Sequence, residues 1–441
     1  MNEGLFYSLA DALIDAIQEA EVLLLSISAE RSDFVRFNHA RVRQAGRVEQ
    51  ATLSIELVRG KRHASANITL CGDPKQDLQR SITALRILRE QLPSLPEDPH
   101  LLYSTNVQST TQLGEDHLPE AADAIDQIIS VADGVDLVGI WASGEIAKGF
   151  ANSLGQRNWF RTYSFHLDWS LYHQADKASK NSYAGTEWDR ADLEARMGRA
   201  RTELEILARP PHTIAPGAYR AYLAPAALLE IVELLSWGGF GLKAHRSKVS
   251  PLMRAVDGTA GFDERIFLDE HAAAGLSPGF NSAGFIKPDR IQLIKEGRFE
   301  GALVSARSAK EYDVPTNGAS ASESPNSLEM APGSLAHDQL LDELSTGIWI
   351  NNLWYLNYSD RPACRMTGMT RFATMWVENG EIVAPLNVMR FDDSAYRILG
   401  EGLIGLTRER ELLLSASTYG QRSTGSARLP GVLVEDFRLT L

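Results

Sequence analysis

Residues 33–70 read DFVRFNHARVRQAGRVEQATLSIELVRGKRHASANITL, and their pattern indicates the architecture of the first half of the chain. Apolar and polar side chains alternate in three runs, at 34–37, 51–57 and 64–70. An alternation of period two places alternate side chains on opposite faces of a β-strand. The short basic segment 59–62 is typical of a hairpin turn. We therefore predict an antiparallel meander here.

The segments around this meander carry the marks of helices and of further strands. Asp73 followed by Pro74 is a helix start, because the acid can cap free backbone N–H groups and proline suits the first turn. We expect this helix to end near residue 91. Helical or strand patterns also occur in other segments of this half: an amphipathic helix at 5–20, a buried strand at 22–28, a helix at 119–132, strands at 137–147 and 159–171, and a polar helix at 190–208.

The chain has 441 residues, which is more than one ordinary core accommodates, so we expect two domains. Prolines at 210 and 211 end the preceding helix, and we place the boundary there. The sequence predicts an α+β protein. An N-terminal domain (1–208) would combine an antiparallel sheet with helices, and a C-terminal domain (209–441) would be strand-rich, either a sheet or barrel-like.

Within the second half we expect a helix at 225–237, ended by the glycines of 238–241, and strands from 347 onward. Residues 313–334 are rich in Ser, Pro, Asn and Gly. We expect this stretch to lack regular structure, as either a functional loop or a disordered segment.

Composition and charge exclude several classes of protein. The formal charge is −13 and the Lys and Arg residues are scattered, which argues against nucleic-acid binding. No apolar stretch approaches the roughly 20 residues that span a bilayer, and the N-terminus lacks the basic start of a secretory signal. The two cysteines, Cys71 and Cys364, are expected to be buried free thiols. These features predict a soluble cytoplasmic protein without a membrane partner.

The ten histidines show no metal-binding spacing, since HExxH, HxH and Cys-x-x-Cys are all absent. His166 and Asp168 would share one face of a strand, where we expect a structural hydrogen bond rather than a catalytic pair. The run 269–271 (Asp-Glu-His) is expected to be a solvated turn. The residues alone therefore predict no metal and no cofactor, and they leave the activity open.

A series of short segments, spread over nearly the whole chain, resembles the TldD/PmbA family in order and spacing. The family comprises intracellular zinc peptidases and their partners, once called modulators of DNA gyrase. The segments are 34–37 (FVRF), 152–155 (NSLG), 223–225 (LAP), 267–270 (FLDE), 291–297 (IQLIKEG), 316–318 (TNG), 332–333 (PG), 347–348 (GI), 377–382 (VENGEI) and 429–434 (LPGVLV).

The resemblance implies where the family's zinc chemistry would lie. Peptidase subunits of the family carry HExxxH on the helix after the proline matched here by Pro225, and a cysteine near the chain end completes the ligand set. Here Glu230 and Leu235 stand at the histidine positions, Ile231 stands at the position of the general base, and no cysteine follows Cys364. Ile231 cannot accept a proton and Leu235 offers no lone pair. The pattern resembles the PmbA (TldE-like) branch, which lacks the metal ligands.

The resemblance therefore implies a non-catalytic subunit of a TldD/PmbA-type metallopeptidase complex, dimeric through its C-terminal domain. Its partner would be a TldD-like zinc-peptidase chain or a second copy. An extended peptide would add to a sheet edge through main-chain hydrogen bonds. Thr316, Asn317 and Gly318, within the stretch 313–334, are the predicted peptide-binding residues. The aromatic strands at 349–358 could contribute, or could instead be core.

Two alternatives remain open from the sequence. The chain could be a stand-alone homodimeric peptide-binding protein without a catalytic partner. It could also be a peptidase with an unrecognised site that uses His166, Asp168 or the run 269–271.

Overall fold

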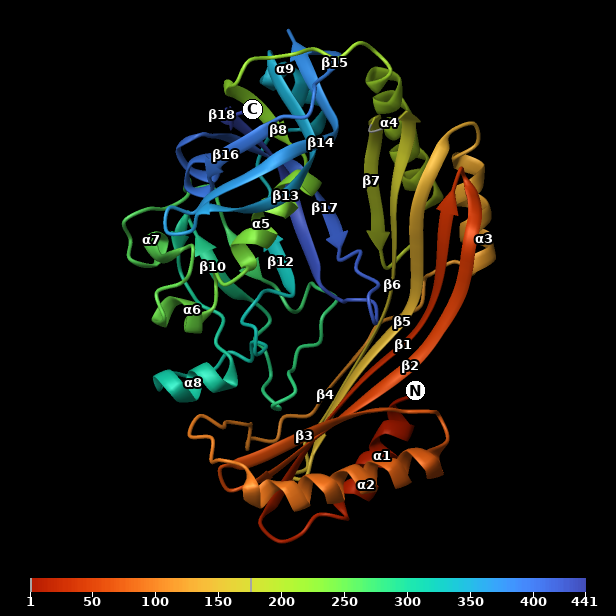
Figure 1. Cartoon of the computed structure of the whole chain (residues 1–441), viewed down its shortest axis with the longest axis vertical. Coiled ribbons are helices and arrows are strands. Elements are labelled where there is room, and N and C mark those ends of the chain that lie inside the picture. Colours follow the sequence, from red (N-terminus) through yellow and green to blue (C-terminus); the bar gives the residue numbers. More distant parts are fainter. Residues whose placement is uncertain (1, 175–176) are drawn as a thin grey trace.

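The computed structural model describes residues 2–174 and 177–441, and within them the strands form two large sheets (Figure 1). The seven strands of the first sheet are β1 (Glu21–Asn38), β2 (Arg41–Arg59), β3 (Arg62–Thr69), β4 (Thr110–Leu113), β5 (Asp136–Asn152), β6 (Arg157–Gln174) and β7 (Lys177–Gly185). The helical elements of this half are α1 (Glu3–Ile14), α2 (Pro74–Gln91), η1 (Leu92–Ser94), α3 (Ala121–Val131) and α4 (Arg190–Leu207).

β1, β2 and β3 form the predicted antiparallel meander, with tight turns at 39–40 and 60–61. β1 runs unbroken for 18 residues, so the predicted strand at 22–28 and the run at 34–37 are parts of one strand. Alternate side chains of β1, such as Leu25 and Val35, are buried beneath the helices. One alternation that continues in phase over the whole strand explains why the two segments are not separate.

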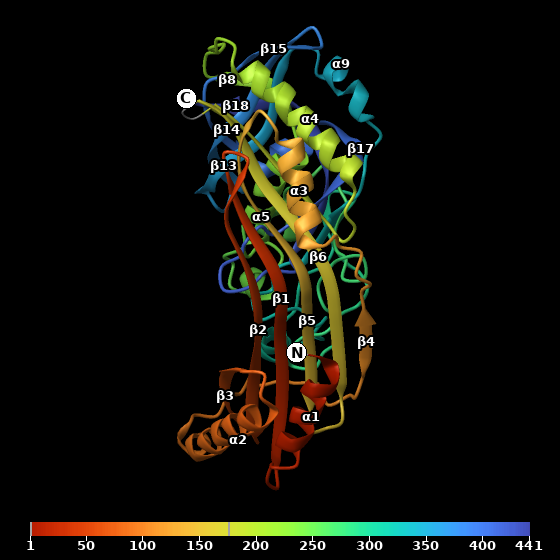
Figure 2. The same cartoon turned by 90° about the vertical axis from the view of Figure 1, so that its right-hand side faces the viewer.

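The helices lie on one face of this sheet. α1 and α2 cover it at one end of the molecule, and α3 and α4 cover it toward the other end (Figure 2). The predicted helix start is confirmed, since the Asp73 side chain accepts hydrogen bonds from the backbone N–H of Lys75 (2.9 Å) and Gln76 (3.1 Å). The opposite face, which we call the inner face, points toward the second half of the chain (Figure 1).

The second sheet has eleven strands: β8 (Gly217–Leu223), β9 (Leu268–Glu270), β10 (Ile291–Lys295), β11 (Arg298–Phe299), β12 (Ser327–Met330), β13 (Gly347–Asp360), β14 (Arg365–Glu378), β15 (Glu381–Pro385), β16 (Arg390–Ser394), β17 (Leu403–Leu414) and β18 (Ser426–Leu439). Its helical elements are α5 (Pro225–Ser236), α6 (Leu242–Arg246), α7 (Met253–Val256), α8 (Ala306–Tyr312), η2 (His337–Gln339), α9 (Leu340–Leu344) and η3 (Arg397–Glu401).

Five of these strands close into a ring, in the order β8, β13, β14, β16 and β18, because β18 also pairs with β8. The largest apolar cluster of the molecule lies in this half and includes Leu228 and Ile231 of α5. The α+β class and the barrel-like second half are therefore confirmed. No helix in the described ranges is both long and apolar enough to cross a membrane.

Two expectations for the second half were wrong. The stretch 313–334 contains β12, which lies inside the sheet between β9 and β18. The run 269–271 is no solvated turn, because Asp269 and Glu270 belong to β9 and are 7% and 3% exposed. Both strands are only three or four residues long, too short for a periodic pattern to show in the sequence.

Candidate functional site

Helix α5 carries the three positions of the family's zinc motif. Ile231 is fully buried and Leu235 is 2% exposed, and both pack in the core of the second half. Glu230 is less buried than these two residues. Burial raises the pKa of Glu230, the nearby charge of Glu233 adds to this, and Lys180 of β7 opposes it. The apolar side chains of Ile231 and Leu235 thus face the core of the second half, whereas the carboxyl groups of Glu230 and Glu233 lie outside that core.

These residues do not fit a zinc ion. Ile231 and Leu235 have no donor atoms, and among residues 2–174 and 177–441 no group of three His, Cys, Asp or Glu side chains is placed to hold a metal. Cys364 is fully buried, and burial raises the pKa of its thiol to about 12. A thiol with such a pKa stays protonated at neutral pH and is a poor ligand.

The middle of the inner face of the first sheet is polar. Residues of even number in β1 and β6 point to it, including Ser28, Glu30 and Ser32 in β1, and Ser164 and His166 in β6. A hydrophilic sheet face that looks toward another part of the same chain is suited to hold a polar ligand. We call the region between this face and the second half, whose open parts are the two cavities described below, the interdomain groove.

The loop 415–425, between β17 and β18, reaches from the second half to the inner face and is hydrogen bonded to it. Its Arg422 is 3% exposed, and its guanidinium donates hydrogen bonds to Ser164 O (2.6 Å), Ser164 Oγ (2.7 Å), Ser32 Oγ (3.1 Å) and Gly144 O (3.2 Å). Burial lowers the pKa of Arg422 to about 10, and the carboxylate of Glu30 opposes this shift. One side chain thereby joins three strands of the first sheet to the second half.

His166 and Asp168 do not form the predicted hydrogen bond. Asp168 Oδ2 lies 3.8 Å from Lys180 Nζ instead, and burial raises the pKa of Asp168 against the pull of that lysine. His166 Nε2 is buried without a hydrogen-bond partner, and burial together with the charge of Arg422 lowers the pKa of His166 to about 4. The imidazole is therefore neutral at physiological pH. The neighbouring guanidinium is that of Arg422, which is far from His166 in the sequence and reaches it only through the tertiary structure.

A second junction between the two halves is apolar. Phe280 of the second half is 7% exposed and packs among Leu24, Phe150 and Phe160 of the first sheet. Phe280 begins a small hairpin, 280–286, that hydrogen bonds also attach to the first half: Ser104 N donates to Ala283 O (2.8 Å) and Gln156 Nε2 donates to Gly284 O (2.8 Å). The two halves are thus held in a defined relation at this end of the groove.

Two cavities lie on either side of the segment 278–282. One of about 270 Å³ is bounded by β1, β2 and β5 of the inner face, where Lys148 Nζ donates to Ser28 Oγ (2.5 Å). The other, of about 500 Å³, opens between the first sheet and segments of the second half, and we call it the junction cavity. Its walls include residues of the segments 98–102, 277–287, 305–308 and 319–326, together with Glu56, His63, Lys243 and Thr424.

Thr316, Asn317 and Gly318 lie directly before the wall 319–321 of the junction cavity, and their polar groups form internal hydrogen bonds. Thr316 Oγ1 donates to Val304 O (2.6 Å), and Asn317 exchanges bonds with Val304 N (2.9 Å) and Ala302 O (2.7 Å). Gly318 has φ +73°, and a Cβ there would lie 3.0 Å from Ile286 O. These residues hold the cavity wall in place.

The run 269–271 belongs to a charged cluster that sequence reasoning did not anticipate. Asp269 lies directly opposite Glu329 of β12. Burial raises the pKa of Asp269, whereas hydrogen bonds from His271 and Arg410 outweigh burial and lower the pKa of Glu329. Arg290 Nη1 lies 3.4 Å from Asp269 Oδ2. The cluster balances its charges internally.

Glu270, the middle residue of that run, points elsewhere. Its Oε2 accepts hydrogen bonds from Asn326 N and Ser327 N, both at 2.9 Å, and its charge acts on Lys287 of the junction cavity.

The aromatic strand at 349–358 is divided between core and surface. Ile350 and Leu353 are buried, whereas Trp354 and Tyr355 are 38% and 79% exposed. Arg371 of β14 lies over the Trp354 ring at 5.0 Å. Neither predicted role, peptide surface or core, describes the whole strand.

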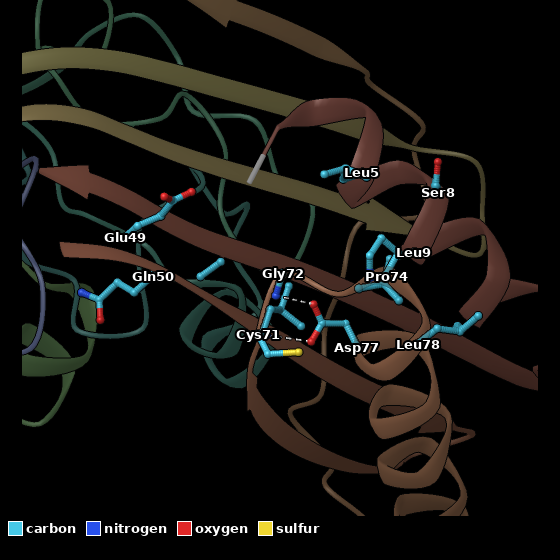
Figure 3. A pocket seen from close by; sticks show the side chains of 12 residues that line it. Leu5, Ser8, Leu9, Glu49, Gln50, Cys71, Gly72, Pro74, Asp77 and Leu78 are labelled. Atoms are coloured by element: carbon cyan, nitrogen blue, oxygen red, sulfur yellow. Dashed lines mark hydrogen bonds between the residues drawn. The ribbon is translucent and has the colours of Figure 1, made fainter. Parts of the chain in front are cut away.

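A further hollow of about 590 Å³ lies outside the groove, between α1, α2 and β2 (Figure 3). Its buried carboxylate, Asp77, accepts hydrogen bonds from Cys71 N (2.8 Å) and Gly72 N (2.9 Å) and so joins β3 to α2. Cys71 is exposed here, contrary to the expectation that both thiols are buried. Because Asp77 is fully used in this contact, we assign it a structural role.

Residues 216–441 match the PmbA/TldA metallopeptidase C-terminal domain, and the chain belongs to the PmbA/TldD family. Three solved structures share the fold over almost their whole length. They are a Thermotoga maritima protein described as a candidate modulator of a DNA gyrase (TM-score 0.77, 14% identity, 99% of this chain and 100% of that one), TldE from Thermococcus kodakarensis (0.75, 15%, 99% and 100%), and a Bacteroides thetaiotaomicron protein described like the first (0.74, 16%, 100% and 98%). No curated protein matches the chain.

Proposed function

We propose that this chain is a non-catalytic subunit of a TldD/PmbA-type metallopeptidase complex. Its partner would be a related chain that carries the zinc ligands. The observation that carries this proposal is the composition of α5 at the three motif positions, where Ile231 and Leu235 are buried hydrocarbon and only Glu230 could bind a metal. A membrane or nucleic-acid partner is not part of the proposal.

The chain would contribute by holding an extended, unfolded peptide in the interdomain groove. The polar inner face, the two cavities beside 278–282 and the fixed spacing between the halves support this role. We propose that Thr316, Asn317 and Gly318 serve the peptide site by holding the wall of the junction cavity. We place the complex in the cytoplasm, because free thiols such as Cys71 and Cys364 are typical of reducing compartments.

The test compares the purified chain with its mixture with a TldD-like zinc-peptidase chain from the same source. We expect the chain alone to contain far less than one zinc per molecule by elemental analysis and to leave an unstructured fluorogenic peptide uncut. The mixture should co-elute as one species in size-exclusion chromatography and cleave the peptide. Stoichiometric zinc in the chain alone would overturn the proposal.

The same experiment separates the alternatives. Peptide retention without cleavage, whether or not the second chain is present, would identify a stand-alone peptide-binding protein. Cleavage by the chain alone that is lost in His271→Ala or His166→Ala would identify a peptidase with its own site.

A further inference from the structure

The junction cavity contains a lysine whose charge is not balanced. Its acids are engaged by other cations: Asp98 Oδ2 lies 2.5 Å from Arg307 Nη1 and 3.4 Å from His63 Nε2, and Glu56 Oε1 lies 2.7 Å from His63 Nδ1. Lys287 also lines the cavity. In the described part of the chain, no carboxylate lies within ion-pair distance of its ammonium group.

The nearest charge that acts on Lys287 is Glu270, but this carboxylate is already the acceptor for Asn326 N and Ser327 N. Burial lowers the pKa of Lys287. A desolvated ammonium without a close counter-ion is an unfavourable arrangement, and an anion that enters the cavity would relieve it.

The backbone that carries Lys287 is rigidly held. Lys287 N donates to Gly279 O (2.8 Å) and closes the hairpin 280–286. Asn281 Oδ1 accepts from Ala283 N (3.0 Å) and Phe285 N (3.1 Å) inside that hairpin. Since the Phe280 end of the hairpin is also packed against the first sheet, the backbone that carries Lys287 is preorganised.

The cavity suits the end of a peptide better than a phosphate group. The cavity volume of about 500 Å³ is in the range of pockets that bind small molecules, so the cavity has room for the last residues of a peptide. Phosphate sites usually gather several convergent donors, often a bidentate arginine, whereas Arg307 here is engaged by Asp98. Two lysines line the cavity, the part-buried Lys287 and the exposed Lys243. The Lys287 ammonium lies among serine hydroxyls, and this single buried charge suits one carboxylate.

We propose that Lys287 binds a carboxylate of the peptide that occupies the groove, and that the junction cavity encloses the peptide end that bears it. This inference rests on the proposed function and specifies the chemical group of the peptide, a carboxylate, that the chain would recognise. The carboxylate is supplied either by the free C-terminus or by an acidic side chain near it.

The test uses the full chain and three fluorescein-labelled peptides of one unstructured sequence: with a free C-terminal carboxylate, with a C-terminal amide, and with the amide plus one Asp at the penultimate position. Fluorescence anisotropy measures each Kd. We expect a carboxylate-bearing peptide to bind about 10-fold tighter than the plain amide, as a charge-assisted hydrogen bond would give. Tighter binding of the first peptide assigns the C-terminus, and tighter binding of the third assigns an acidic side chain.

Variants locate the effect. Lys287→Gln should reduce the affinity for the carboxylate-bearing peptide to that for the plain amide, and Lys287→Arg should retain the difference. Lys295→Gln, at the exposed last residue of β10, is the matched control and should behave like the unmodified chain. Equal thermal melting of all variants would show that they are folded.

The peptide-binding experiment can contradict the carboxylate inference alone or the proposed function as a whole, and the two results differ. If all three peptides bind equally and Lys287→Gln changes nothing, the carboxylate inference is wrong while the peptide-binding role stands. If no peptide binds, either to the chain or to its mixture with the zinc-bearing partner, the proposed function itself is wrong.

Discussion

At the residue scale, Arg422 has the greatest structural consequence. Its guanidinium lies on the inner face of the first sheet, although its loop, 415–425, joins two strands of the second sheet. A buried charged donor that meets several acceptors contributes strongly, because removing it leaves those acceptors without a partner. The buried and partly unpaired Glu30 lies in the same cluster.

We predict that Arg422→Ala lowers the free energy of unfolding by about 3 kcal/mol, the scale of losing hydrogen bonds to a charged group. Urea denaturation at pH 7 measures this. Arg408→Ala, at an exposed position of β17, is the control and should change the value by less than about 0.5 kcal/mol. Equal effects of both substitutions would contradict the assigned role of Arg422.

His166 should make stability depend on pH. Its pKa is about 4 in the folded chain, below the ordinary value of 6.5, so the unfolded chain binds the proton more readily. The contribution of neutral His166 is therefore complete above pH 6.5 and is lost as the pH falls toward 4. From pH 7 to 4.5 the loss is about 2.5 kcal/mol.

His166→Gln should remove this part of the pH dependence. Urea midpoints at pH 7 and pH 4.5, for the variant and the unmodified chain, give the difference directly. Parallel profiles for the two proteins would show that His166 is protonated as easily in the folded state as in the unfolded one.

At the element scale, the pairing of β1 with β5 depends on a glycine. Gly144 has φ +145°, and a Cβ there would lie 2.2 Å from Arg31 O on the neighbouring strand. Any side chain would force the two strands apart at the point where Arg422 binds. This constraint explains a glycine in the middle of a long strand, where it would otherwise be unfavourable.

Gly144→Ala is expected to destabilise the chain by at least about 2 kcal/mol through this overlap. The matched control is Gly46→Ala on β2, where an added Cβ meets nothing within 4 Å. Thermal melting followed by circular dichroism compares them. A Gly144→Ala variant as stable as Gly46→Ala would mean that the strands can separate at little cost.

At the scale of the whole molecule, the groove exists because the two halves are fixed to each other. The Phe280 contact lies at one end, Arg422 lies between, and Ile206 and Leu207 of α4 pack on Ala373 and Met375 of β14 at the other end. A cavity between two halves keeps its shape only if such contacts prevent relative motion.

We therefore predict one calorimetric unfolding transition for the unmodified chain and two for the double variant Phe280→Ala/Arg422→Ala. Replacing a buried phenylalanine by alanine alone costs about 3–5 kcal/mol, and here the loss falls on the contact between the halves. A single transition in the double variant would indicate that the remaining contacts suffice to couple the halves.

The sequence by itself determined the local elements and the absence of the zinc motif. Alternation of period two along 33–70 fixes strands, and the Asp73–Pro74 pair fixes a helix start, because both act between residues close in the chain. The side chains of Ile231 and Leu235 lack metal-donor atoms in any fold.

Only the tertiary structure placed Arg422 and Lys287. Arg422 contacts Ser164, 258 positions away, and no local pattern encodes such a contact. The unbalanced charge of Lys287 likewise appears only when Asp98, Glu56 and Glu270 are seen to be engaged elsewhere. The physical reason is that burial and charge balance are properties of the assembled groups, whereas propensity and periodicity are properties of the chain.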